Sequence, residues 1–276
     1  MTSDRPLAHD RGGPSGGLPL LLLHAGVADR RMWDPVWAGL TAAHDVVRVD
    51  LRGYGESSSR PAGLLDHVDD VLCTLSALGV TRCHVVGASY GAGVAVEVAL
   101  TAPDLVASLV LCAPGGALIA EATDQLRAFF AAERSALEAG DVDAAVEANL
   151  ATWVDGPGRG PGEVPEHVRE AVRAMQRRAF ELTADWDDVG EAELEPPALE
   201  RLGEVTVPTT VLVGRLDVDA VAVTASRVAT GVPGARLVQW PDVAHLPSME
   251  RPDDVVALVR EHLTAWREPP SAPPRR

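Results

Sequence analysis

Ser89 stands at the centre of the pentapeptide GASYG at residues 87–91, which matches the pattern G-x-S-x-G. An apolar run at residues 83–86 precedes it, and a run compatible with a helix follows at residues 92–100. Where a strand turns sharply into a helix, the middle residue takes a strained backbone conformation, and small neighbours prevent a clash. The serine hydroxyl then stands at the edge of the sheet, above the positive end of the helix. The pattern therefore predicts a nucleophilic serine.

A serine hydroxyl needs a base to take its proton and a third group to orient that base. In doubly wound sheets such groups gather where the carboxyl ends of the strands emerge. Asp217 follows the apolar run at residues 210–213, and His245 lies in the loop after residues 237–240. The chain order serine, acid, histidine belongs to one architecture of serine hydrolases. We therefore expect Ser89, His245 and Asp217 to act as nucleophile, base and orienting acid.

Competing residues exist for both partners of the serine. The chain has eight histidines, and most of the others fall in or beside helix and strand patterns, where a core or solvated histidine is expected. Among the carboxylates, Asp219 falls at the start of the next helix and can favour its dipole. Asp242 lies close to His245 and can shape that loop. Asp217 is preferred because it sits in the turn directly after a strand.

The oxyanion of a tetrahedral intermediate needs two hydrogen-bond donors. One should be the backbone N–H of Tyr90, which directly follows the nucleophile. The second should come from the loop after the first strand, where the small residues let the backbone approach a substrate. Gly26 is favoured there, with Val27 as the neighbouring possibility. His24 in the same loop is expected to brace it and not to transfer a proton.

Short apolar runs alternate with helical patterns, which is typical of a doubly wound, mainly parallel α/β sheet with helices on both faces. The expected strands are residues 18–24, 46–50, 83–87, 106–112, 209–213 and 236–239, and the expected core helices are residues 65–78, 90–102, 218–230 and 252–266. From about residue 115 to 205 the pattern shows helices only, at residues 123–139, 142–153 and 165–182. We expect this block to be a lid over the strand ends; the alternative is extra helical packing on a sheet face.

The predicted organisation is an α/β core at residues 18–114 and 206–267 with an inserted helical cap at residues 115–205. Residues 1–17 and 268–276 are rich in glycine, proline and polar residues and are expected to be flexible tails. The first tail lacks the cationic start and apolar stretch of a signal peptide.

Composition narrows the function further. A net charge of −16 argues against nucleic acid and anionic membrane surfaces as partners, because both select basic patches. The three cysteines fit no metal spacing and lie in apolar segments, as expected for reduced thiols in a cytoplasmic protein. We expect a small-molecule substrate, no metal, and a monomer or homodimer.

Five segments together resemble motifs of the α/β-hydrolase family. They are LLHAG at residues 22–26 with Trp33 beyond it, DLRGYGES at 50–57, GASYG at 87–91, GRLD at 214–217 and HLPSMERP at 245–252. Ala25 departs from the glycine usual in the family, and the resemblance covers roughly residues 18–266. It implies a mostly parallel sheet of about eight strands, a helical cap, and cofactor-free hydrolysis through an acyl-enzyme.

A serine at this turn argues against the haloalkane dehalogenases and epoxide hydrolases of the same family, which use aspartate. The expected substrate is a carboxylic ester of small to medium size and largely apolar character. Enol-lactonase, thioesterase and C–C bond hydrolase activities remain open, as does a small-molecule receptor on the same fold. An enol-lactone carries carboxylates and would need a cation such as Arg127 or Arg215. The residues expected to contact the substrate are Val27, Trp153, Met175 and Leu246.

Overall fold

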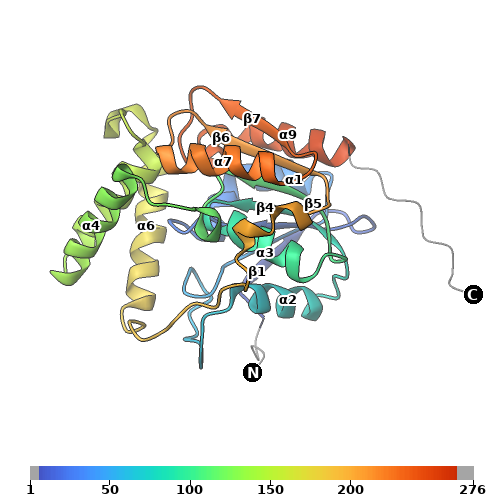
Figure 1. The fold of residues 1–276 in the computed structure, drawn as a ribbon, viewed down its shortest axis with the longest axis horizontal. Coiled ribbons are helices and arrows are strands. Elements are labelled where there is room, and N and C mark those ends of the chain that lie inside the picture. The colour runs from blue at the N-terminus through green and yellow to red at the C-terminus, as the bar shows by residue number, and fades with distance from the viewer. Residues whose placement is uncertain (1–5, 266–276) are drawn as a thin grey trace, which may run out of the picture.

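The most apolar runs of the sequence form the middle of the sheet. They are β2 (Leu20–Leu23), β4 (Cys83–Ala88), β5 (Val106–Cys112) and β6 (Thr209–Gly214), and every residue in them is buried. Strands covered on both faces read as continuous apolar runs because neither face meets water. The computed structural model describes residues 6–265 and has helices on both faces of this sheet (Figure 1).

The order of the strands creates a switch point next to β2. The sheet runs β1-β3-β2-β4-β5-β6-β7, with β3 at Val46–Val49 and β7 at Arg236–Trp240. All neighbouring strands are parallel except β1 and β3, which are antiparallel. The chain goes outward from β2 to β3 and then returns to the other side of β2 as β4. Open α/β sheets bind ligands at the carboxyl ends of the strands where the order reverses in this way.

Strand β1 (His9–Gly12) lies inside residues 1–17, which the sequence predicts to be a flexible tail, and that prediction is wrong for this part. The strand is polar because it is an edge strand held by its backbone pairing with β3 and by the ion pair of Arg11 with Asp45, 2.7 Å apart. Its composition therefore looks like that of a loop. The described residues form seven strands where about eight were expected. Residues 1–5 and the predicted tail at 268–276 lie outside the described part.

The helices of the core cover the two faces of the sheet. One face carries α1 (Asp34–Thr41) and α9 (Pro252–Ala265), which pack together; the other carries α2 (His67–Ala77), α3 (Tyr90–Thr101) and α7 (Asp219–Gly231) (Figure 1). A short helix, α8 (Pro247–Glu250), precedes α9. Among residues 6–265 no helix combines the length and the apolar character needed to cross a bilayer.

The segment between β5 and β6 contributes a group of helices at one end of the sheet (Figure 1). They are α4 (Asp124–Glu138), α5 (Val142–Asn149) and α6 (Glu166–Thr183), and we call them the cap helices. The side chains of Thr123 and Asp141 cap the first two by accepting backbone hydrogen bonds. Helix α5 is shorter than the expected residues 142–153, because the chain continues as a π-helix over Leu150–Asp155.

After α6 the chain returns along the core. The backbone N–H of Leu65 donates to the carbonyl of Gly190, and the N–H of Ala192 donates to the carbonyl of Leu65, both at 2.8 Å. This short parallel bridge pairs Glu191 with Leu65, just before the start of α2. The segment therefore lies along the space between α6 and the core, although its sequence shows no strand pattern.

Candidate active site

Ser89 occupies the turn between β4 and α3 with φ 51° and ψ −115°. A positive φ is unusual for a residue with a side chain, and such strain persists only where the surroundings hold it. Here the N–H of Ser89 donates to the carbonyl of Cys112 at 2.8 Å, and its carbonyl accepts from Ala92 at 2.9 Å and Gly115 at 3.1 Å. The strained turn that the pentapeptide predicts is therefore present, and the strand β5 fixes it.

The two glycines of the pentapeptide are required by close packing. A Cβ on Gly91 would lie 2.5 Å from the carbonyl oxygen of His24, and a Cβ on Gly87 would lie 2.4 Å from the carbonyl oxygen of Gly91. Both distances are far below a van der Waals contact. Helix α3 can therefore lie against the ends of β2 and β4 only because these positions have no side chain.

Three side chains that are distant in sequence form one hydrogen-bonded chain. Nε2 of His245 lies 2.7 Å from Oγ of Ser89, and its Nδ1 lies 2.8 Å from Oδ2 of Asp217. The other carboxylate oxygen of Asp217 accepts from the N–H of Val218 at 2.7 Å. His245 and Asp217 are buried. A carboxylate at Nδ1 makes that nitrogen the donor, so Nε2 is left to accept the serine proton.

The two competing carboxylates face other partners. Asp242 forms an exposed ion pair with Arg251 at 2.8 Å. Asp219 accepts a hydrogen bond from the hydroxyl of Thr123 at 2.6 Å and one from the N–H of Ala220 at 2.7 Å. The structure therefore brings only Asp217, among these three aspartates, to the imidazole of His245.

The loop after β2 lies directly against the start of α3. A Cβ on Gly26 would lie 3.5 Å from Cβ of Tyr90. Tyr90 is the first residue of α3, where backbone N–H groups have no acceptor inside the helix. Within residues 6–265 neither its N–H, nor those of Gly26 and Val27, donate to any acceptor. These free donors are available to an oxyanion next to Ser89.

His24 braces this loop, as the sequence analysis expects. Its Nδ1 donates to the carbonyl of Ala25 at 2.9 Å, and its Nε2 accepts from the N–H of Leu51 at 2.9 Å. The imidazole is fully buried, and this burial lowers its pKa. A neutral imidazole can fill both roles at once, so His24 links the ends of β2 and β3.

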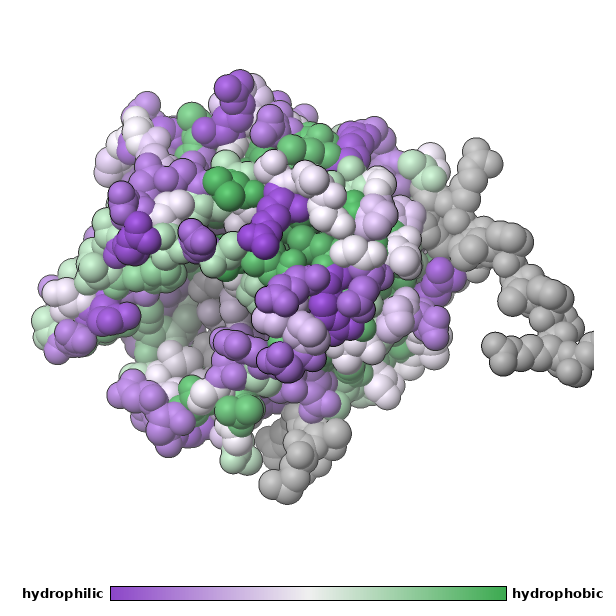
Figure 2. Space-filling view, viewed as in Figure 1, coloured by the Kyte–Doolittle hydropathy of each residue, from purple (hydrophilic) through white to green (hydrophobic). Residues whose placement is uncertain are grey.

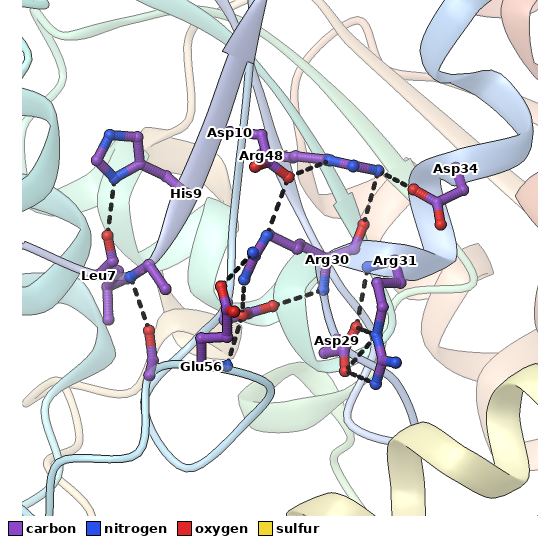
Figure 3. A network of polar contacts seen from close by, with 12 residues as sticks. Leu7, His9, Asp10, Asp29, Arg30, Arg31, Asp34, Arg48 and Glu56 are labelled. Carbon is purple, nitrogen blue, oxygen red and sulfur yellow. Dashed lines mark hydrogen bonds and ion pairs between the residues drawn. The ribbon is translucent and has the colours of Figure 1, made fainter.

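A network of charges fixes the same loop from the other side (Figure 3). Arg30 follows the loop and contacts the buried carboxylate of Asp50 as well as Glu56 and Asp10. The N–H of Arg30 also donates to Asp50 at 2.8 Å. The desolvation of Arg30 is outweighed by these carboxylates, so its pKa is raised. Sequence reasoning missed this role of Asp50 and Arg30, although Asp50 opens one of the quoted motifs.

The segment between β5 and β6 covers the imidazole of His245. The ring of Trp153 packs on that of His245 with centroids 4.5 Å apart, and Phe129 meets Trp153 edge-on at 5.2 Å. Trp153 lies in the π-helical segment, and Gly156 follows it with φ 75°. A Cβ on Gly156 would lie 2.3 Å from the carbonyl oxygen of Leu216. The chain therefore crosses directly over the loop that carries Asp217, which fixes the tryptophan above the site.

The other residues expected to contact a substrate are all buried near these loops. Met175 of α6 accepts a hydrogen bond from the N–H of Asp29 through its sulfur at 3.4 Å, so α6 rests on the loop after β2. Val27 lies in that loop, and Leu246 directly follows His245. Among the described residues no group of three or more His, Cys, Asp or Glu side chains is placed to hold a metal ion.

The chain is similar to known esterases in sequence and in fold. The strigolactone esterase RMS3 of Pisum sativum is 28% identical over 246 residues, covering 86% of this chain and 90% of that protein. The rhodomycin D methylesterase DauP of a Streptomyces species is 27% identical over 283 residues, covering 92% and 93%. A thermophilic esterase structure from Thermogutta terrifontis superposes with a TM-score of 0.75 at 25% identity, covering 97% of each chain.

Other matches are partial: the chain spans 35% of the length of one curated relative and 41% of another. The model of the Alpha/beta hydrolase family, in contrast, matches residues 20–258, which include all of the strands except β1. By this match and by its fold, the chain belongs to the alpha/beta hydrolase family of enzymes.

Proposed function

We propose that this protein is a cofactor-free serine hydrolase that cleaves carboxylic esters through an acyl-enzyme. The observation that carries the proposal is the continuous chain from Ser89 Oγ through His245 to Asp217, with contacts of 2.7 and 2.8 Å. This arrangement turns an unreactive hydroxyl into a nucleophile, because the imidazole removes its proton as the new bond forms.

In the proposed reaction, Oγ of Ser89 attacks the carbonyl carbon of the ester while its proton passes to Nε2 of His245. The negative charge that develops on the carbonyl oxygen is held by the N–H groups of Tyr90 and Gly26. The intermediate collapses, the C–O bond to the leaving group breaks, and His245 gives its proton to the leaving oxygen. A water molecule, deprotonated by the same nitrogen, then attacks the acyl-enzyme and frees the acid and Ser89.

Asp217 has two tasks in this cycle. It accepts the hydrogen bond from Nδ1 and so fixes the tautomer of His245, and it stabilises the imidazolium that forms in each half-reaction. Burial makes both tasks more effective, because a charge pair away from water is less screened. The hydrogen bond from Val218 holds the carboxylate in the orientation that these tasks need.

Several observations support an uncharged ester as substrate. Apolar rings of Trp153 and Phe129 cover the base. Arg127, one cation that could meet a second carboxylate, is exposed and bound to Asp124, and Arg215 is exposed. This favours a simple ester over a carboxylate-bearing enol-lactone. The esterases among the relatives act on esters, which fits the same choice.

The test is steady-state turnover of p-nitrophenyl esters of short acyl chains by the purified chain and by Ser89→Ala. We expect turnover that the substitution lowers by ~10³-fold or more. A fluorophosphonate probe should label the wild-type protein and leave Ser89→Ala unlabelled. Saturable binding of the esters without release of product would contradict the proposal and favour a receptor.

A further inference from the structure

A cavity of about 220 Å³ lies between the cap helix α6 and the core. Phe180 and Trp186 line it from the cap side, and Tyr54 and Tyr90 line it from the core side. Figure 2 shows the surface hollowed between the cap helices and the core. The walls are therefore aromatic, as in many pockets that hold a small organic molecule.

Two polar side chains in this cavity lack a partner. His67 opens α2 and Gln176 lies on α6, and each is about 5% exposed. Nδ1 of His67 and Oε1 of Gln176 are buried, and no described residue offers either of them a hydrogen bond. Burying a polar atom without a partner costs free energy, and native proteins rarely keep one without a use.

The histidine is neutral in this position. Burial lowers the pKa of His67 to about 4, so near neutral pH the ring carries one N–H donor and one acceptor nitrogen. Gln176 offers an amide oxygen that only accepts. Arg52 and Glu191 also line the cavity, and the guanidinium of Arg52 is already bound to the buried carboxylate of Asp70. A hydroxyl group on a ligand can bond to both side chains. Its hydrogen can be donated to the amide oxygen of Gln176, and its oxygen can accept from the imidazole N–H of His67.

Tyr90 connects this cavity to Ser89. Tyr90 follows the serine directly, and its Cβ lies against Gly26. Its ring lines the cavity and packs edge-on against the ring of His67, with centroids 5.3 Å apart. The leaving group of an ester must lie near His245, which protonates it, and Trp153 covers that side. The space beyond Tyr90 is therefore left for the acyl group.

We propose that this cavity is an acyl subsite and that His67 and Gln176 select esters whose acyl chain carries a hydroxyl group. The proposal rests on the ester hydrolysis proposed above. It assigns His67 and Gln176 to substrate recognition at a distance from the reacting carbonyl. Binding energy gained there raises kcat/KM for the hydroxylated acyl chain over its apolar counterpart.

The experiment compares kcat/KM for two matched substrates, p-nitrophenyl 6-hydroxyhexanoate and p-nitrophenyl heptanoate, in which a methyl group replaces the hydroxyl. The wild-type protein should prefer the hydroxylated ester by about tenfold or more. His67→Leu and Gln176→Met should each remove most of this preference, and the loss should appear in kcat/KM for the hydroxylated ester. The control is His167→Leu, an exposed histidine on α6, which should keep the full preference.

The melting temperature of each variant shows whether it still folds. Each substitution removes a buried polar atom that has no partner, so the melting temperature should stay equal or rise. Turnover of both esters without a preference, or a preference that survives in both variants, would overturn the subsite and leave the proposed hydrolysis standing. Failure of the wild-type protein to hydrolyse either ester would overturn the proposed function, and the subsite with it.

Discussion

Trp153 packs on His245 with ring centroids 4.5 Å apart and an angle of 43° between the rings. The tryptophan lies in the π-helical segment that follows α5 and the histidine lies in the loop after β7, so this contact joins the segment between β5 and β6 to the candidate active site. An apolar ring on one face of the imidazole keeps water from that face. In the proposed reaction it also forms a wall for the leaving group that receives the proton of His245.

Trp153→Ala should raise KM for esters with an aromatic leaving group by about tenfold, because it removes a large apolar contact surface. The effect on kcat should be smaller, since Ser89, His245 and Asp217 stay in place. Steady-state kinetics on p-nitrophenyl esters measure both constants. Phe130→Ala removes an exposed ring of the cap helices and is the control. An unchanged KM in Trp153→Ala would show that the leaving group does not contact this ring.

Asp217→Asn should lower kcat by ~10³-fold or more, because an amide in this position can donate to Nδ1 and favours the wrong tautomer of His245. KM should change little, since the side chain does not reach the substrate. Asp242→Asn is the matched control and should keep wild-type turnover, because Asp242 only pairs with the exposed Arg251. Loss of turnover in Asp242→Asn with retention in Asp217→Asn would reverse the assignment of the acid.

The meeting of Ser89, Asp217 and His245 could be predicted from the sequence, because each follows a predicted strand. The strands before Ser89 and Asp217 are buried and apolar, and His245 follows the more exposed edge strand β7. Parallel strands deliver their carboxyl ends to one edge, so residues far apart in sequence converge there. The edge strand β1 could not be predicted in this way, because a polar edge strand has no apolar run. That Nδ1 of His67 and Oε1 of Gln176 lack hydrogen-bond partners could not be predicted either, since this depends on how α2 and α6 pack.

The cap contains a buried ion pair whose loss should be measurable. Arg169 contacts Asp155, and their side chains are 5% and 3% exposed. Arg169→Met leaves a buried carboxylate without its partner and should lower the free energy of unfolding by about 3 kcal/mol. Urea denaturation of the variant measures this change. Arg177→Met breaks an exposed pair with Asp143 and should change stability by less than about 1 kcal/mol.

The double variant Arg169→Met with Asp155→Leu separates the buried charge from the loss of the arginine stem. Removing both charges should recover most of the stability lost in Arg169→Met, since no unpaired ion then remains. A double variant as unstable as the single one would mean that the packing of the arginine stem, and not the charge, supports the π-helical segment that carries Trp153.

Buried histidines should make the protein less stable in acid. Burial, helped by Arg236, lowers the pKa of His262 to about 4, and the ring lies 2.9 Å from the hydroxyl of Thr210. An unfolded histidine titrates near about 6.5. Between these two values the unfolded chain binds more protons than the folded one, so the free energy of unfolding falls as the pH falls through this range.

His262→Gln should therefore weaken the pH dependence of stability. Between pH 7 and pH 5 the variant should lose less unfolding free energy than the wild-type protein, by about 2 kcal/mol, because one proton-linked group is gone. Urea denaturation at both pH values gives this difference independently of any constant loss from the substitution. His167→Gln changes an exposed histidine and should reproduce the wild-type slope. Equal slopes in His262→Gln and the wild-type protein would mean that His262 accepts its proton without unfolding.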